Sequence, residues 1–331
     1  MVQKFLRQLA KRWRIIAGDL ATPRHLAMLG LVLAAIAWGI SFVVTRGAVT
    51  NYPVVGFLFL RFAVGGSVLV AVGLISPASR GRWRQVPKGL LLLLGAVLAA
   101  AYLAQTLGLE LGAGPGVAAA LTSLVVVITP LLEWALRGQA PDGRVVVGAL
   151  LAIGGSLLVC LTVPVQGGGG QPHAGLGMAL EVFAAAAFSL QVVLVGRLGH
   201  RVPAVALGAW QLLALATVLG LAVPFSGGLA VPSVSVLADI VFCGLAASAF
   251  AFAVQAAAQQ HVSSSVAALI MAVEPGVAMV GGAVAGMQAL TPLALLGLVL
   301  LSGGSAAPSR ERMQRWARRL FSPLGRLPRP A

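Results

Sequence analysis

Charged side chains are scarce in this sequence, and acidic ones are the scarcest. Only 9% of the 331 residues are charged, with eight Asp and Glu against 23 Lys and Arg. An ordinary soluble domain carries about 25% charged residues, so this composition does not fit the surface of a soluble enzyme. The sequence is instead 59% hydrophobic, with a mean hydropathy of +0.97. This excludes a disordered chain and predicts a protein that crosses a membrane several times.

Residues that form disulfides, metal sites and catalytic centres are also few. The two cysteines, Cys160 and Cys243, lie inside apolar runs and are expected to be small packing residues. The four histidines lie outside these runs or at their ends. No HExxH or GxSxG motif is present, and the glycine run 167–170 lacks the Lys-Ser/Thr of a phosphate-binding loop. We therefore expect no enzyme activity, no metal and no cofactor.

What the sequence does contain is a series of long apolar segments. Each approaches the length of about 20 residues that a helix needs to cross the hydrocarbon core. Proline and glycine punctuate the gaps between them. We expect an all-α integral membrane protein of ten transmembrane helices, at about 28–49, 54–76, 89–110, 115–137, 144–164, 174–197, 204–226, 236–259, 262–287 and 290–307.

The two ends of the chain are basic. In residues 1–27, Phe5, Leu9, Trp13 and Ile16 recur at helical spacing among Lys and Arg, which predicts an amphipathic helix on an anionic membrane face rather than a signal peptide. The predicted organisation is a basic segment, a first repeat, a glycine-rich linker, a second repeat and a basic tail, at 1–27, 28–164, 165–173, 174–307 and 308–331.

The basic residues also predict the orientation. With ten helices, 21 of the 23 Lys and Arg fall on one side, and the exceptions, Arg46 and Arg61, lie within or at the end of a span. The positive-inside rule makes that side cytoplasmic, together with both termini. Because these charges occupy gaps between spans rather than one folded face, we expect lipid and not nucleic acid as a partner. The oligomeric state stays open, and a monomer is compatible with this arrangement.

The two halves of the chain match each other at a shift of 145–150 residues. The matched pairs are Pro53 with Pro203, Arg61 with Gln211, Gln105 with Gln255, Pro130 with Pro275, and Gln139 with Gln288. Each repeat holds five helices, and because five is odd the second repeat enters the membrane from the opposite face. Inverted repeats of this kind are typical of secondary transporters. The alternative is a duplicated bundle that only packs.

Two prolines mark the fourth helix of each repeat. Pro130 and Pro275 each remove a backbone donor and are expected to kink their helices. Interrupted spans at corresponding positions of two halves indicate a transport site, so we expect these kinks to act in gating. A kink that serves only packing is the alternative.

At these residues the sequence resembles the drug/metabolite transporter superfamily, specifically the EamA-type permeases with ten helices, over about 28–307. The resemblance rests on Ala37-Trp38-Gly39, Ser41-Phe42, Leu60-Arg61-Phe62, Tyr102, Gln105 to Leu109, Ile128-Thr-Pro130, Gln255, Ala267 to Ile270 and Glu274-Pro275. It implies export of small metabolites, often amino acids or drugs, across the bacterial inner membrane. Many members place Glu after Gly at the end of the fourth helix, where this chain has Gln139 and Gln288. The role of that carboxylate therefore does not carry over.

Ionisable residues inside the spans are functional candidates by default. Glu274 lies near the middle of the ninth span, where an ionised carboxylate costs about 2.5–3.5 kcal/mol. We expect it to bind a substrate ammonium or carry a coupling proton; a structural hydrogen bond or a fixed ion pair is the alternative. Arg61 is expected to hold a substrate carboxylate or to pair with an acid, or else to extend to the interface. Glu133 is spaced to pair with Arg137, and Glu181 lies inside the sixth span.

Uncharged polar and aromatic residues complete the predicted substrate site. Hydrogen bonds between helices, worth only about 0.6 kcal/mol each, are the alternative role of the polar ones. The expected site comprises Trp38, Ser41, Arg61, Tyr102, Gln105, Gln191, Trp210, Gln211, Gln255 and Glu274, with Ser123 and Ser189 as further polar candidates.

The sequence as a whole predicts a secondary transporter that exports a small metabolite, amino acid-like or amphipathic and drug-like, by alternating access. Two alternatives remain open. One is a flippase for an amphipathic lipid, and the other is a membrane scaffold or sensor that transports nothing.

Overall fold

The computed structural model describes residues 22–75, 88–138, 140–141, 143–163, 173–199 and 201–306. Within these ranges every regular element is a helix. The predicted amphipathic helix before residue 22, the basic tail and Gln139 lie outside the described residues, as does most of the expected linker.

Helices fill both halves of the chain. The first half contains α2 (Pro23–Val49), α3 (Val54–Ile75), α4 (Lys88–Glu110), α5 (Pro115–Thr122), α6 (Val125–Arg137) and α7 (Gly143–Thr162). The second half contains α8 (Ala174–Leu198), α9 (Ala204–Ala222), the short η2 (Val223–Phe225), α10 (Val234–Gly244), the π-helical η3 (Leu245–Phe250), α11 (Ala251–Ala258), α12 (Ser264–Met271), α13 (Glu274–Val284) and α14 (Pro292–Ala306).

Among the described residues, nine helical stretches are long and apolar enough to cross a membrane, some of them built from two or three consecutive elements. The tenth predicted span corresponds to α14, whose apolar part Pro292–Leu301 is shorter. Large aliphatic side chains are exposed around the outside, such as Leu161 at 82% and Val299 at 65%. An apolar exterior of this kind suits lipid rather than water.

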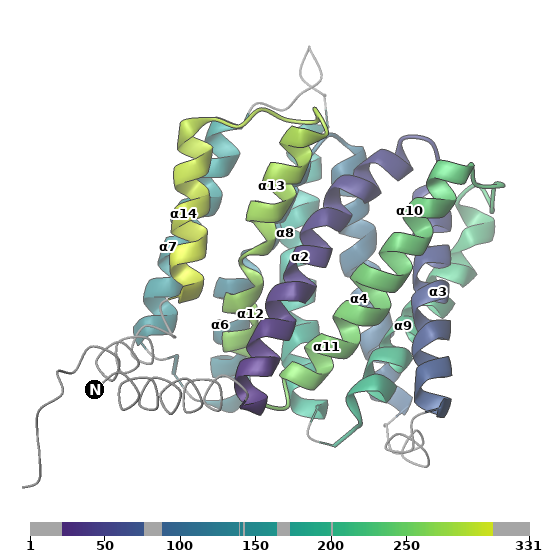
Figure 1. Cartoon of the computed structure of the whole chain (residues 1–331), viewed down its shortest axis with the longest axis horizontal. Helices are drawn as coiled ribbons and strands as arrows, with labels where there is room; N and C mark the ends of the chain where they lie inside the picture. The colour runs from purple at the N-terminus through teal and green to yellow at the C-terminus, as the bar shows by residue number, and fades with distance from the viewer. Residues whose placement is uncertain are drawn as a thin grey trace, which may run out of the picture.

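The helices of the two repeats pack in a reciprocal order. Counterparts meet directly, because α3 packs on α9 and α7 on α14, at opposite edges of the molecule in Figure 1. The first span of each repeat packs on the third span of the other: α2 lies against α11, and α4 against α8. The fourth spans cross, with α5 beside α13 and α6 beside α12. This exchange of partners fits the predicted inverted repeat.

Small residues allow the closest of these contacts. A Cβ atom on Gly155 in α7 would lie 2.5 Å from the carbonyl oxygen of Gly297 in α14, so no larger residue fits without moving a helix. Gly39 in α2 meets α13 in the same way, where a Cβ would lie 2.8 Å from the Glu274 carbonyl oxygen. Close approach through glycine is a usual way for membrane helices to pack.

The fourth span of each repeat is interrupted at the same place. The helices after the two interruptions, α6 and α13, begin 149 residues apart, as do the helices before them, α5 and α12. At both junctions the backbone hydrogen bonds change from i→i−4 to i→i−3, such as Leu124 N to Leu121 O and Val273 N to Ile270 O, which makes a tighter turn.

The two prolines do not occupy corresponding positions, which differs from the sequence alignment. Pro130 lies inside α6, whereas Pro275 falls in the first turn of α13, where a proline costs no intrahelical hydrogen bond. The alignment of the two prolines uses a shift of 145 residues, four fewer than the helix ends require. The counterpart of Glu274 is therefore Val125, the first residue of α6.

Candidate functional site

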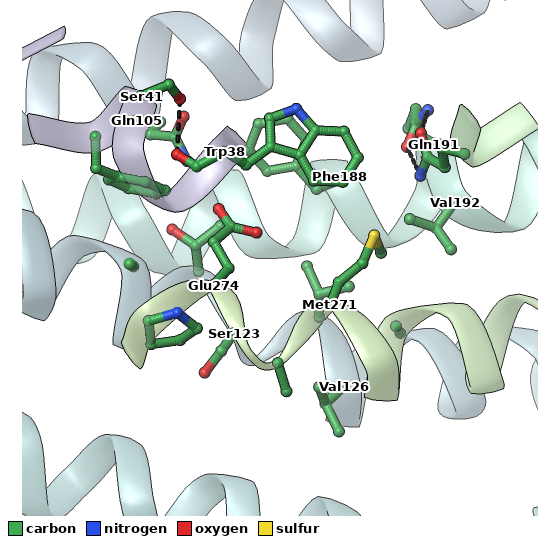
Figure 2. Close-up of a pocket in the computed structure, with 18 of the residues that line it drawn as sticks. Trp38, Ser41, Gln105, Ser123, Val126, Phe188, Gln191, Val192, Met271 and Glu274 are labelled. Carbon is green, nitrogen blue, oxygen red and sulfur yellow. Dashed lines mark hydrogen bonds between the residues drawn. The ribbon is translucent and has the colours of Figure 1, made fainter. Parts of the chain in front are cut away.

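A cavity lies between the two repeats, at the interruptions of their fourth spans. It encloses about 640 Å³ of space free of atoms, part of which is open to the outside. Its lining comes from α2, α4, α5, α6, α8, α11, α12 and α13 (Figure 2). The lining residues are Trp38, Ser41, Phe42, Tyr102, Gln105, Ala119, Thr122, Ser123, Val125, Val126, Phe188, Gln191, Val192, Phe252, Gln255, Ala268, Met271, Ala272, Glu274 and Pro275.

Seven of the ten predicted substrate-binding residues line this cavity, and three do not. The seven are Trp38, Ser41, Tyr102, Gln105, Gln191, Gln255 and Glu274. Gln211 and Arg61 lie behind lining residues, and Trp210 packs among apolar residues such as Leu207. Of the further candidates, Ser123 lines the cavity, whereas Ser189 donates to the Ala185 carbonyl oxygen within its own helix.

Glu274 is the only charged side chain in the lining. It is the first residue of α13, so the partial positive charge of the helix N-terminus lies beside it. Glu274 is partly exposed, and its carboxyl group lies on the side of the cavity where Figure 2 shows Trp38, Ser41 and Gln105. Within the described residues no hydrogen-bond donor contacts this carboxyl group, and the one cation that acts on it electrostatically is Arg61. The carboxyl group is therefore available to a ligand.

Arg61 is held away from the cavity by other groups. It is 2% exposed, and its Nε donates to Ser248 Oγ at 3.0 Å. Its guanidinium carbon lies 5.0 Å from the ring centre of Phe62 and 5.2 Å from that of Tyr102. Cation–π contacts of this kind stabilise a desolvated guanidinium. This placement gives no support to the expected contact between Arg61 and a substrate carboxylate.

The π-helical η3 supplies an anchor that the sequence did not predict. The carbonyl oxygen of Ala247 in η3 accepts a hydrogen bond from Trp38 Nε1 at 2.8 Å and a longer one from Arg61 Nη2 at 3.5 Å. A π-helical turn leaves carbonyl groups outside the usual α-helical pattern, and such turns often occur at functional sites. This one fixes the indole ring that lines the cavity.

Three glutamines from three helices meet at one end of the cavity. Gln191 Nε2 in α8 donates to Gln211 Oε1 at 2.8 Å and to Gln255 Oε1 at 3.2 Å. Gln211 in turn donates to the Leu207 carbonyl oxygen at 3.3 Å. Gln211 does not line the cavity itself but is hydrogen-bonded to Gln191, which does.

Aromatic rings form much of the remaining wall. Tyr102 packs at 4.9 Å from Phe188 and 4.6 Å from Phe62, and Trp38 lies 5.9 Å from Phe252, all measured between ring centres. Sequence reasoning missed Phe42, Phe188, Phe252 and Met271, because one apolar residue does not stand out in an apolar span. It also missed Thr122, whose hydroxyl gives the same weak signal as any other buried Ser or Thr.

Polar contacts between the repeats lie at the ends of the crossing fourth spans. Gln288 is 4% exposed, accepts a hydrogen bond from Gly116 N at 2.9 Å and donates one to the Met279 carbonyl oxygen at 3.0 Å. A glutamate could accept the first bond but, when ionised, could not donate the second. At the other end, Ser265 donates to Glu133 Oε2, and the expected pairing of Glu133 with Arg137 involves a side chain outside the described part of the structure.

The chain matches the EamA-like transporter family over residues 25–161 and 175–307, once for each half. It belongs to this family. Solved structures are also similar: one, described only as "Crystal structure of protein", has a TM-score of 0.70 and 23% identity, over 89% of this chain and 98% of its own. At that identity the likeness concerns the fold alone. No curated protein matches the chain.

Membership of the EamA-like family identifies a multi-pass membrane protein of the drug/metabolite transporter type. Members of this family are transporters rather than enzymes. Within the described residues, no group of three or more His, Cys, Asp or Glu is placed to hold a metal ion. The cavity combines one accessible carboxyl group, several amides and aromatic walls.

Proposed function

We propose that this protein is a secondary transporter that exports a small amphipathic amine across the bacterial inner membrane by alternating access, with both termini in the cytoplasm. The observation that carries the proposal is the position of Glu274. It is the one charged group of a cavity that both repeats line, beside the two helix interruptions. A rocking motion of one repeat against the other would expose such a site to each side in turn.

The lining favours a cation over a zwitterion. A substrate ammonium would pair with the Glu274 carboxylate, while its apolar body would pack on Trp38, Tyr102 and Phe188. An amino acid would also need a partner for its own carboxylate, and Arg61 is engaged with Ser248 and Ala247 outside the lining. Of the two substrate types that the sequence suggests, the amphipathic and drug-like one, in the form of an amine, therefore fits better than the amino acid.

The same carboxyl group would couple transport to protons. A proton and a substrate cation compete for Glu274, so the site carries one or the other across the membrane. This exchange drives export when protons enter the cell down their gradient. Cation binding should weaken as the pH falls, because protonation removes the negative charge that holds the ammonium.

Three compounds that share a phenyl ring test the substrate class. Phenethylamine is a cation, phenylalanine a zwitterion and 3-phenylpropionate an anion at neutral pH. We expect the purified protein to bind phenethylamine most tightly, phenylalanine less and 3-phenylpropionate not at all, measured by calorimetry in detergent. Equal or tighter binding of phenylalanine would contradict the proposed class.

Transport itself requires a cation that cannot leak through lipid as a free base. Trimethylphenethylammonium carries a permanent charge and meets this need. In proteoliposomes we expect a pH gradient to drive its accumulation only when the protein is present. A protein that binds this cation yet moves none of it under any gradient would favour the scaffold or sensor instead.

A further inference from the structure

A second carboxyl group lies directly behind the cavity wall, and the proposed function leaves it without a role. Glu181 in α8 is 0% exposed. Glycines make the space for it, since a Cβ on Gly108 in α4 would lie 2.8 Å from Glu181 Oε1. Gly177, one turn earlier in α8, packs closely on the carbonyl oxygen of Gly108. The neighbouring helices thus enclose this one carboxyl group.

The hydrogen bonds of Glu181 are too few for an ionised carboxylate. Its Oε2 lies 3.0 Å from Thr122 Oγ1, and its Oε1 has no partner among the described residues. A buried charge is stable only when it is paired or well supplied with donors. The charged group that acts on Glu181 electrostatically is Glu274 in α13, which is also negative when ionised. Gly108 of α4 and the Thr122 hydroxyl of α5 also lie beside this carboxyl group.

The hydrogen bonds of the Thr122 hydroxyl indicate whether Glu181 carries a proton. The Thr122 hydroxyl is 2.8 Å from the Ala118 carbonyl oxygen as well as 3.0 Å from Glu181 Oε2. A hydroxyl carries a single hydrogen, and a carbonyl oxygen can only accept. An ionised Glu181 would leave one of the two acceptors without a hydrogen from the Thr122 hydroxyl. A protonated Glu181 satisfies both contacts, because it donates to Thr122 while Thr122 donates to Ala118.

We propose that Glu181 is a second proton-binding group of the transport site, protonated in this conformation and connected to the cavity through Thr122. Thr122 lines the cavity, so its hydroxyl touches both the buried acid and the space that a substrate would occupy. When a cation enters, the Glu181 O–H bond breaks and the hydrogen passes to Thr122 Oγ. Thr122 gives its own hydrogen to a water molecule in the cavity, which leaves a carboxylate and a hydronium ion.

The consequence rests on the proposed exchange at Glu274. With two acids at the site, each exported cation is matched by two protons rather than one. Glu274 binds the cation directly, and Glu181 adds the second proton without touching the substrate. The ratio of protons to cations then separates the contributions of the two carboxyl groups.

Infrared spectroscopy of the full chain in liposomes tests the protonation without any substrate. We expect wild-type protein at neutral pH to show the carbonyl stretch of a protonated, buried carboxylic acid. Glu181→Gln should remove this band, whereas Glu274→Gln should leave it in place. If Glu181→Gln removes no such band, Glu181 is ionised and the proposal is overturned. The band is independent of transport, so its presence in a protein that exports no amine would reject the proposed function and keep the proton site.

Thr122→Val provides a second test should Glu181→Gln fail to fold. Removing the hydroxyl should shift the same carbonyl band, because the hydrogen-bond partner is lost. The matched control is Thr217→Val, which removes an exposed hydroxyl that donates to Leu213 in α9 and should leave the band unchanged. A band that Thr122→Val leaves at the same frequency, as the control does, would overturn the connection between Glu181 and Thr122.

The coupling ratio tests the function of the second acid. In proteoliposomes held at zero membrane potential, the cation gradient that stops net flux of trimethylphenethylammonium at a fixed pH gradient gives the number of protons exchanged per cation. We expect two for wild type and one for Glu181→Gln. The same ratio in both proteins would exclude Glu181 from coupling.

Discussion

The two repeats build the same interrupted helix, but only the second repeat places an acid at the interruption. Glu274 begins α13, and at the corresponding position Val125 begins α6. Both side chains line the cavity. The two repeats therefore share one helical frame, while the charged side chain of the lining belongs to the second repeat alone.

The third spans differ in a similar way. In the first repeat α4 is one regular helix, whereas its counterpart is divided into α10, the π-helical η3 and α11. In η3, the Ala247 carbonyl oxygen accepts hydrogen bonds from both Trp38 and Arg61 of the first repeat. The sequence counterpart of Arg61, Gln211, instead supports Gln191. The second repeat thus fixes a lining residue in each half, Trp38 of the first repeat and its own Gln191, with different chemistry.

The largest expected effect comes from moving the acid between the repeats. Glu274→Val should abolish binding of phenethylamine, since removing one partner of a buried charge pair costs about 2–5 kcal/mol, or roughly 30-fold or more in affinity. Adding Val125→Glu should restore part of this binding, because Val125 lines the same cavity. Calorimetry on the single and double variants measures both changes. A folded double variant that binds no amine would show that the two positions are not interchangeable.

Arg61 should contribute to stability and not to substrate choice. Arg61→Met removes the donor to Ser248 Oγ, the longer of the two hydrogen bonds to the Ala247 carbonyl oxygen and two ring contacts, so we expect a loss of about 1–3 kcal/mol in stability. Thermal unfolding in detergent measures this loss. The preference for phenethylamine over phenylalanine should stay the same. A selective loss of phenylalanine binding would instead return Arg61 to the substrate site.

The contact between the fifth helices offers a matched pair of glycines. Gly155→Ala should destabilise the protein by about 1–3 kcal/mol, because its Cβ would meet the backbone of α14. Gly154→Ala is the control, since a Cβ there meets nothing within 4 Å. The two variants should differ clearly in thermal unfolding. Equal stability would mean that α7 and α14 are not held as closely as described.

The smallest effect is expected at Gln288. Gln288→Glu keeps the acceptor for Gly116 N but removes the donor to the Met279 carbonyl oxygen. A net hydrogen bond contributes about 1 kcal/mol, so a loss of that size is expected in thermal unfolding. No change would indicate that this bond contributes little to the contact between the repeats.

The sequence predicts the arrangement of membrane spans well, because this arrangement depends on the length and number of the apolar segments. Apolar length identifies the spans, and an odd number of helices in each repeat predicts the inversion. Glu274 stands out since an acid in an apolar span has no ordinary explanation, and it does line the cavity. The sequence does not identify Phe188 and Phe252 as lining residues, because an apolar residue in an apolar span differs little from its neighbours.

Other features depend on contacts that no pattern encodes. The partners of Arg61 come from a π-helical segment 187 residues away, and nothing in the sequence around Ala247 predicts that turn. Pro130 and Pro275 do not mark the points where the fourth spans are interrupted. An alignment of the two prolines is therefore four residues out of register with the alignment of the helix ends. The sequence also does not predict the protonation of Glu181, because that inference depends on the contacts of the Thr122 hydroxyl with Glu181 and Ala118.

The central claim is that Glu274 exchanges protons for a cation inside the cavity. The most direct test is the change in internal pH when trimethylphenethylammonium is added outside proteoliposomes. We predict that wild type and Glu110→Gln, which alters an exposed acid at the end of α4, raise the internal pH as the cation enters and protons leave. Glu274→Gln should produce no change. An equal rise with Glu274→Gln, in protein that is folded and inserted to the same extent, would contradict the account.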